Sequence, residues 1–346
     1  MSTAAIVGAG MMGSAMCVPL CDNGHEVRLV GTDLDREIIE SVARDRWHPT
    51  LQRKLPRGIV PMQVEALAAA VSNADLIICG VSSFGVEWFA EHVAPLIPAG
   101  TPVLAVTKGL AEGENGCLIP YPHWWARNAK TGRHLSFNAI GGPCTSYELA
   151  DRRHSHVHFC GSELAVLKKL KAVLETAYYH VSLSTDVVGI ESAAALKNAY
   201  ALVVTLAVGL QQRVEGEGCQ LANNPQAALF GQSVREMTEL VRLLGGRPES
   251  VTAGIADLFV TIFGGRTRKL GTLLGRGLTF SQAMEELSGV TLESVVITTR
   301  IARAVRGQAA QGFAPDDAFP LLMHIDEVIN KGAAVNLPWH KFSLPA

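Results

Sequence analysis

The chain has 346 residues, a hydrophobic fraction of 48% and a formal net charge of −2, from 30 Lys and Arg against 32 Asp and Glu. This balance is typical of a globular protein with room for two domains, and it excludes the strongly basic surface of a nucleic-acid-binding protein. The seven cysteines are odd in number and lack a CxxC pair or zinc-ligand spacing, so we expect a reducing, cytoplasmic setting and no metal site; the N-terminus shows no secretory signal pattern.

The first half of the chain alternates between strand-like and helix-like patterns. Apolar, β-branched runs bounded by Gly or Pro predict strands over 4–8, 25–31, 75–81, 102–109, 135–142, 156–161 and 179–185. Helical patterns over 12–24 and 33–45 follow the first two of these runs. Such alternation is typical of βαβ units, so we predict an α/β domain over residues 1–187, a Rossmann-like doubly wound sheet.

The second half is predicted to be helical, with long helices over roughly 189–213 and 224–245 and shorter ones to about residue 331. We therefore assign residues 188–346 to an all-α substrate and catalytic domain. The stretch 195–210 is almost wholly apolar, but a membrane span of about 20 residues would also include Glu191 and Lys197. We expect a core helix that carries Lys197 to a cleft and no membrane span; a lysine snorkelling to the surface is the alternative.

A glycine-rich turn follows the first predicted strand. Gly8, Gly10 and Gly13 form G-A-G-M-M-G between a strand and a helix, the arrangement that lets a backbone approach a pyrophosphate at a helix N-terminus. Asp33 follows the second strand about 20 residues later, where an acid accepts a hydrogen bond from a ribose 2′-hydroxyl and repels a 2′-phosphate. The pattern predicts a dinucleotide site that prefers NAD to NADP. The alternatives are a glycine-rich turn that binds no ligand and an Asp33 that is simply solvated.

Seven short motifs, several with charged or hydroxyl side chains, are distributed along the chain. The motifs are G-A-G-M-M-G-S-A (8–15), V-S-S-F (81–84), T-K-G-L (107–110), G-P-x-x-x-x-E (142–148), A-L-K-N (195–198), A-D-L (256–258) and G-G-R-x-R-K (264–269). In their order and spacing, from the first strand to about residue 331, the chain resembles the NAD-dependent glycerol-3-phosphate dehydrogenase family.

The resemblance implies an oxidoreductase that interconverts sn-glycerol 3-phosphate and dihydroxyacetone phosphate. It implies Lys197 as proton donor to the substrate carbonyl, with Lys108 and Asp257 as its partners. For the substrate it implies contacts from Arg266, as ligand of the phosphate, and from Thr267, Asn198 and Thr261. For the cofactor it implies contacts from Gly8, Gly10, Met11, Met12, Gly13, Asp33, Ser83, Phe84, Lys108, Ser146, Arg266 and Glu293.

The chain also departs from the family pattern near the expected substrate. Segment 210–229 is about five residues longer than usual and lacks a Gly-Asp-Gly turn, Thr267 replaces an asparagine, and Ser82 replaces a proline. These changes leave open another phosphorylated ketose or a 2-keto acid as substrate. A dinucleotide sensor without turnover is disfavoured because the lysines and Arg266 are present. The apolar stripes of the second domain are compatible with a homodimer.

Two other groups of residues are interpreted as structural rather than functional. Trp124 and Trp125 are interpreted as core residues rather than a lid or an interface. His154, His156 and His158 alternate along a predicted strand and would share one face, but no carboxylate stands beside them to complete a metal site.

Overall fold

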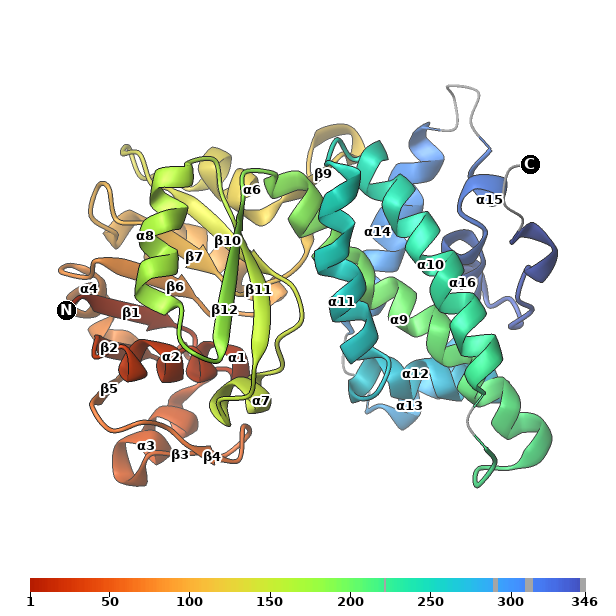
Figure 1. Cartoon of the computed structure of the whole chain (residues 1–346), viewed down its shortest axis with the longest axis horizontal. Coiled ribbons are helices and arrows are strands. Elements are labelled where there is room, and N and C mark those ends of the chain that lie inside the picture. Colours follow the sequence, from red (N-terminus) through yellow and green to blue (C-terminus); the bar gives the residue numbers. More distant parts are fainter. Residues whose placement is uncertain (221, 289–291, 309–313, 343–346) are drawn as a thin grey trace. The chain divides into compact units, whose positions relative to one another are not determined.

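A computed structural model describes residues 1–220, 222–288, 292–308 and 314–342 (Figure 1). The chain forms two compact units, one of residues 1–108 and 120–191 and the other of residues 109–119 and 192–346. Leu221, in the long segment 210–229, and Thr291, which precedes Glu293, lie outside the described residues.

The first unit is built on one eight-stranded sheet. Its strand order is β12 (Tyr179–Ser184), β11 (Ser155–Cys160), β10 (Phe137–Gly141), β7 (Val103–Ala105), β6 (Leu76–Cys79), β1 (Thr3–Val7), β2 (Glu26–Val30) and β5 (Ile59–Met62). Every pair is parallel except β10 with β11. The central strands are buried on both faces, which explains their continuous apolar runs. The predicted doubly wound α/β domain is confirmed.

Short helices flank this sheet (Figure 1). They are α1 (Met11–Ala15), α2 (Cys17–Asp22), α3 (Arg36–Asp45), α4 (Leu67–Val71), α5 (Val86–Trp88), α6 (Tyr121–Asn128), α7 (Ser146–Ala150) and α8 (Leu164–Leu174). Helix α2 packs on β2, α6 on β10 and α8 on β12. Trp125 of α6 is fully buried and donates its indole N–H to the Val86 carbonyl at 3.0 Å, so it is a core residue.

The structure corrects two predictions in this unit and adds one strand. The helix predicted over 12–24 breaks after Ala15, because Pro19 has no N–H for the Ala15 carbonyl and its ring crowds that group. Strand β11 runs antiparallel to β10, because α7 packs against α1 instead of returning along the sheet. Strand β5 was not predicted from the sequence. Its run contains Pro61, which its position at the edge of the sheet tolerates.

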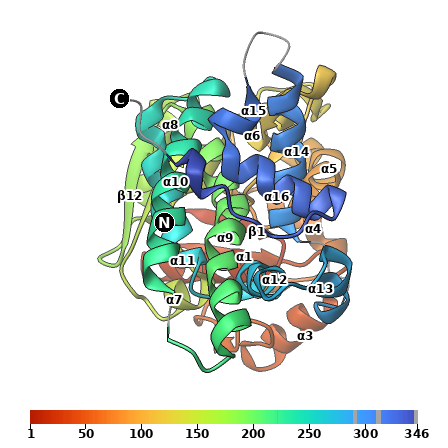
Figure 2. The same cartoon turned by 90° about the vertical axis from the view of Figure 1, so that its right-hand side faces the viewer.

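The second unit is a set of helices around α9 (Val187–Glu215), whose first five residues belong to the first unit (Figure 2). The others are α10 (Asn223–Leu243), α11 (Val251–Thr261), α12 (Gly265–Arg276), α13 (Phe280–Glu286), α14 (Glu293–Gln308), α15 (Pro315–Ala318) and α16 (Pro320–Lys331). Helix α9 has the length and composition of a membrane span, yet 83% of its most apolar window is buried within the protein. It supplies the centre of the unit's hydrophobic core.

Segment 109–119 departs from the predicted boundary at residues 187 and 188, which would leave it in the first domain. It carries β8 (Leu110–Glu112) and all but the last residue of β9 (Leu118–Pro120), which form a small two-stranded hairpin. Leu110 is buried in the second unit's core, and Arg300 of α14 donates to the Leu110 carbonyl at 2.7 Å. Apolar burial and hydrogen bonding to α14 therefore place this hairpin with the helices.

Candidate functional site

The glycine-rich turn is held by three glycines in close backbone contact. Gly8 has a φ of +103°, which favours glycine, and a Cβ there would lie 2.7 Å from the Gly80 carbonyl carbon. A Cβ at Gly13 would lie 2.3 Å from the Gly8 carbonyl oxygen. Only hydrogen fits at both positions, so the turn sits directly against the end of β6. Gly80 was missed from sequence, although its place after an apolar strand was a usable signal.

A cavity of about 440 Å³ opens beside this turn. Its size is within the range of small-molecule sites. A Cβ at Gly10 would meet nothing nearer than the Gly80 carbonyl oxygen at 3.9 Å, so the backbone there is open to a ligand. The lining residues are Gly8, Gly10, Thr32, Asp33, Leu34, Asp35, Gly80, Val81, Ser82, Phe84, Gly85 and Trp88. These residues fit the pyrophosphate and adenosine ribose of a dinucleotide.

The structure gives two neighbouring aspartates different surroundings at the end of β2. The Asp35 carboxylate accepts hydrogen bonds from the backbone N–H groups of Ala9 (3.2 Å) and Thr32 (2.9 Å) and from the Thr32 hydroxyl (2.8 Å). Asp35 therefore fastens the loop to the glycine turn. Asp33 has a mostly exposed side chain that lines the cavity. Of the two, Asp33 is the acid available to a ribose, and the structural role of Asp35 was not predicted.

The other residues expected at the cofactor are distributed more widely. Met11 is exposed, while Met12 lines a small separate cavity together with Lys108 and Cys144. Ser83 begins a short 3₁₀ turn (Ser83–Gly85) next to Phe84, and Ser146 is the buried first residue of α7. Glu293 begins α14 and Arg266 lies in the first turn of α12, both in the second unit.

Lys108 lies just beyond the carboxyl end of β7 and donates to the Gly142 carbonyl, beyond the parallel strand β10, at 3.1 Å. Its positive charge acts on Glu191, a fully buried residue in the same unit. Burial raises the pKa of Glu191 to about 8, and the Lys108 charge opposes that rise. A buried acid beside a candidate catalytic lysine was not predicted from the sequence.

Lys197 is held by two side chains of the facing helix α11. Its ammonium donates to the Asp257 carboxylate at 2.8 Å and to the Thr261 hydroxyl at 3.1 Å. The Thr261 hydroxyl in turn donates to the Asp257 backbone carbonyl at 2.7 Å, which leaves its lone pairs to accept from Lys197. Only 13% of the Lys197 side chain and 4% of the Asp257 side chain are exposed. The lysine that interrupts the apolar run is therefore paired within the protein, not snorkelling to the surface.

The close approach of α9 and α11 depends on small residues one turn away. A Cβ at Gly254 would lie 2.4 Å from the Ala193 carbonyl oxygen. Asp257 follows Gly254 by three residues and Lys197 follows Ala193 by four, so both point the same way from that contact. The glycine thereby fixes the distance across which Asp257 reaches the lysine.

Helix α12 approaches α9 in the same manner. A Cβ at Gly271 would lie 2.1 Å from the Thr205 hydroxyl, and one at Gly275 would lie 2.3 Å from the Leu206 carbonyl oxygen. These contacts fix the helix whose first turn carries the exposed Arg266 and the partly buried Thr267. Asn198 is partly buried next to Lys197 on α9.

Two of the three alternating histidines, His154 just before β11 and His156 within it, have hydrogen-bond partners on β12. His154 Nδ1 lies 3.0 Å from His180 Nε2, and His156 Nε2 lies 2.8 Å from the Ser182 hydroxyl. Within the described ranges, no group of three His, Cys, Asp or Glu side chains is arranged to hold a metal ion.

Comparison with known proteins gives a consistent result along the chain. The family model of the NAD-dependent glycerol-3-phosphate dehydrogenase N-terminus matches residues 3–162, and that of the C-terminus matches residues 186–338. An NADP(+)-dependent glycerol-3-phosphate dehydrogenase from Archaeoglobus fulgidus is 37% identical over 285 residues, 82% of each chain. An NAD(P)+ glycerol-3-phosphate dehydrogenase from Xylella fastidiosa is 30% identical over 86% of this chain and 83% of its own.

Solved structures show the same fold. A glycerol-3-phosphate dehydrogenase from Coxiella burnetii has a TM-score of 0.79 at 23% identity, covering 99% of this chain and 97% of its own. A ketopantoate reductase from Ralstonia eutropha has a TM-score of 0.56 at 17% identity, covering 96% of this chain and 99% of its own. These likenesses concern the fold alone.

Proposed function

Since this chain belongs to the NAD-dependent glycerol-3-phosphate dehydrogenase family, we propose that it interconverts sn-glycerol 3-phosphate and dihydroxyacetone phosphate by hydride transfer. The observation that carries this proposal is the largely buried Lys197, paired with Asp257 and Thr261. Reduction of a ketone creates an alkoxide that needs a proton as it forms, and a positioned lysine supplies one.

The roles of the residues follow from their chemistry. When bound, the nicotinamide supplies or accepts the hydride. Lys197 donates its proton to the carbonyl oxygen of the substrate, and Asp257 holds the ammonium in place. Arg266 binds the substrate phosphate, because its planar guanidinium makes two parallel hydrogen bonds to phosphate oxygens. Lys108, Asn198 and Thr267 are assigned supporting contacts to the substrate and the cofactor.

For the cofactor, we propose that NAD is preferred to NADP. Asp33 lines the cavity with an exposed carboxylate, which accepts a hydrogen bond from a 2′-hydroxyl and repels a 2′-phosphate. Because one relative is NADP(+)-dependent, the preference of this chain is tested by measuring its affinities for NADH and NADPH directly.

The activity is tested by following NADH oxidation with dihydroxyacetone phosphate, beside larger phosphorylated ketoses and 2-keto acids. Efficient turnover of dihydroxyacetone phosphate supports the proposal. A better substrate in the panel would mean that segment 210–229 and Thr267 have changed the specificity around the same hydride chemistry.

The role of Lys197 is tested with Lys197→Ala. We expect kcat to fall by about 10²–10⁴-fold, the contribution of a general acid, while NADH binds with unchanged affinity. Lys331→Ala is the control, since Lys331 lies on α16 and pairs only with Glu327 among the contacts described. Retention of most activity in Lys197→Ala would remove this lysine from the mechanism.

A further inference from the structure

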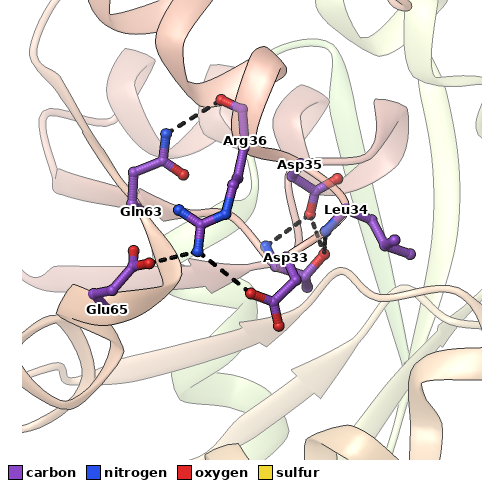
Figure 3. Close-up of polar contacts among 7 residues, drawn as sticks. Asp33, Leu34, Asp35, Arg36, Gln63 and Glu65 are labelled. Carbon is purple, nitrogen blue, oxygen red and sulfur yellow. Dashed lines mark hydrogen bonds and ion pairs between the residues drawn. The ribbon is translucent and has the colours of Figure 1, made fainter.

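Arg36, the first residue of α3, lies between the carboxylates of Glu65 and of Asp33, and Asp33 lines the dinucleotide cavity (Figure 3). One of its terminal nitrogens, Nη2, forms a short ion pair with Glu65 and lies 3.5 Å from the Asp33 carboxylate. Glu65 belongs to a 3₁₀ turn (Val64–Ala66) after the edge strand β5, so it reaches Arg36 from a separate segment. The Gln63 side-chain amide also donates to the Arg36 carbonyl at 3.2 Å.

This position is where a doubly wound fold distinguishes the two cofactors. An acid after the second strand accepts from the ribose 2′-hydroxyl, whereas an arginine nearby accommodates a 2′-phosphate. The chain has both groups, Asp33 and Arg36, within one ion-pair cluster. The neighbouring Asp35 is already occupied by three donors, as described above. The choice of cofactor therefore depends on what holds Arg36.

Charge and exposure indicate how strongly Arg36 is held. Its side chain is 46% exposed, that of Glu65 64% and that of Asp33 70%. Ion pairs this exposed are weak and can be exchanged for a better partner. The hydrogen bond from Arg36 also keeps the pKa of Glu65 below its usual range, so this carboxylate is charged at neutral pH. Two carboxylates against one guanidinium leave the cluster with a net charge of −1.

We propose that Glu65 determines cofactor selectivity in this protein by competing with a 2′-phosphate for Arg36. With Glu65 in place, the guanidinium is neutralised and the cluster disfavours the dianionic phosphate of NADP(H). Without it, the Arg36 guanidinium keeps only its longer contact with Asp33 among the described residues and can form charge-assisted hydrogen bonds to the phosphate oxygens. The proposal rests on the proposed dinucleotide function and assigns selectivity to a residue outside the glycine motif and outside the cavity lining.

The test is Glu65→Gln, with the affinities for NADPH and NADH measured separately by nucleotide fluorescence. We expect NADPH to bind up to about fivefold more tightly, because an exposed ion pair no longer has to be displaced, and NADH to change less than about twofold. The gain should shrink at high salt, because the groups are exposed. Glu37→Gln is the matched control. It removes the same charge from the residue that follows Arg36 on α3, which forms no ion pair with Arg36 among the contacts described.

A second variant separates a specific effect of Arg36 from a general effect of charge. Adding Arg36→Gln to Glu65→Gln should return the NADPH affinity to the wild-type value or below. An equal gain for both nucleotides, an equal gain in Glu37→Gln, or a gain that survives the loss of Arg36 would each overturn the proposal. Binding is measured without substrate, so a failure to turn over dihydroxyacetone phosphate overturns only the proposed substrate. A wild-type protein that binds neither nucleotide overturns both proposals.

Discussion

At the scale of the residue, Glu191 is fully buried and neither carboxylate oxygen has a hydrogen-bond partner among the described residues. Its pKa is raised to about 8 in the folded protein, against an ordinary value of 4.5. Between these two pH values the folded state holds a proton that the unfolded state has lost. The free energy of unfolding therefore falls as pH rises from about 4.5 through 8, by on the order of a few kcal/mol.

Glu191→Gln should remove this part of the pH dependence. We expect the variant to be more stable than the wild type at pH 8 and to lose that advantage at pH 5, as measured by urea unfolding across the range. Glu236, with a pKa raised to about 7 by burial, titrates in the same interval in both proteins, so the difference between the two curves is the readout. Glu40→Gln, at an exposed position on α3, is the control. Parallel curves for the wild type and Glu191→Gln would show that this carboxyl does not titrate as inferred.

Sequence reasoning reached some of these residues and not others. Lys197 stood out because a cation in an apolar helix needs a partner, and the family resemblance named Asp257 and Thr261, which the structure places within 3.1 Å of it. Glu191 and Glu65 gave no such signal. Burial without a partner and an ion pair between residues 29 positions apart are products of tertiary packing, which no local pattern contains.

At the scale of the element, the contact of α9 with α11 makes a sharp prediction. Gly254→Ala would place a methyl group 2.4 Å from the Ala193 carbonyl oxygen. Such overpacking costs about 1–3 kcal/mol, and it would also push Asp257 away from Lys197. We expect a lower Tm together with a reduced kcat.

Gly231 on α10 provides the opposite case. A Cβ there meets nothing within 4 Å, so Gly231→Ala should stabilise the protein by about 0.5–1 kcal/mol through helix propensity. The two substitutions are chemically identical and differ only in their surroundings. Thermal unfolding of both variants checks the pair, and a shift of the same sign in both would contradict the packing argument.

Most strands and long helices could be predicted, because apolar residues recur along them with the spacing typical of each element. The bounds predicted for α9, roughly 189–213, lie within two residues of those observed. The failures have local physical causes. Pro19 interrupts a helix whose apolar pattern continues, and Pro61 lies in a strand that only an edge position permits. The direction of β11 depends on where α7 packs, which its own residues do not encode.

At the scale of the whole molecule, Leu110 and Leu104 belong to different cores although they are only six positions apart. Leu110 lies in the core of the helical unit and Leu104 in the core of the sheet. Truncation of either to alanine should cost about 2–5 kcal/mol. Hydrogen exchange should show the loss of protection in α9 and α14 for Leu110→Ala and in β6 and β10 for Leu104→Ala. Loosening of the same segments in both variants would contradict the division into two units.

The hairpin over 109–119 also has a consequence for how the chain is made. The hydrogen bond from the Arg300 side chain to the Leu110 carbonyl joins residues 190 positions apart, and the core around Leu110 is built mainly from residues of α9 and the later helices. During vectorial synthesis the hairpin leaves the ribosome before any of those helices exist. Its apolar side chains therefore remain exposed to solvent until α14 has emerged from the ribosome. A nascent chain arrested before residue 293 should therefore present this hairpin to chaperones, while one released after residue 308 should not.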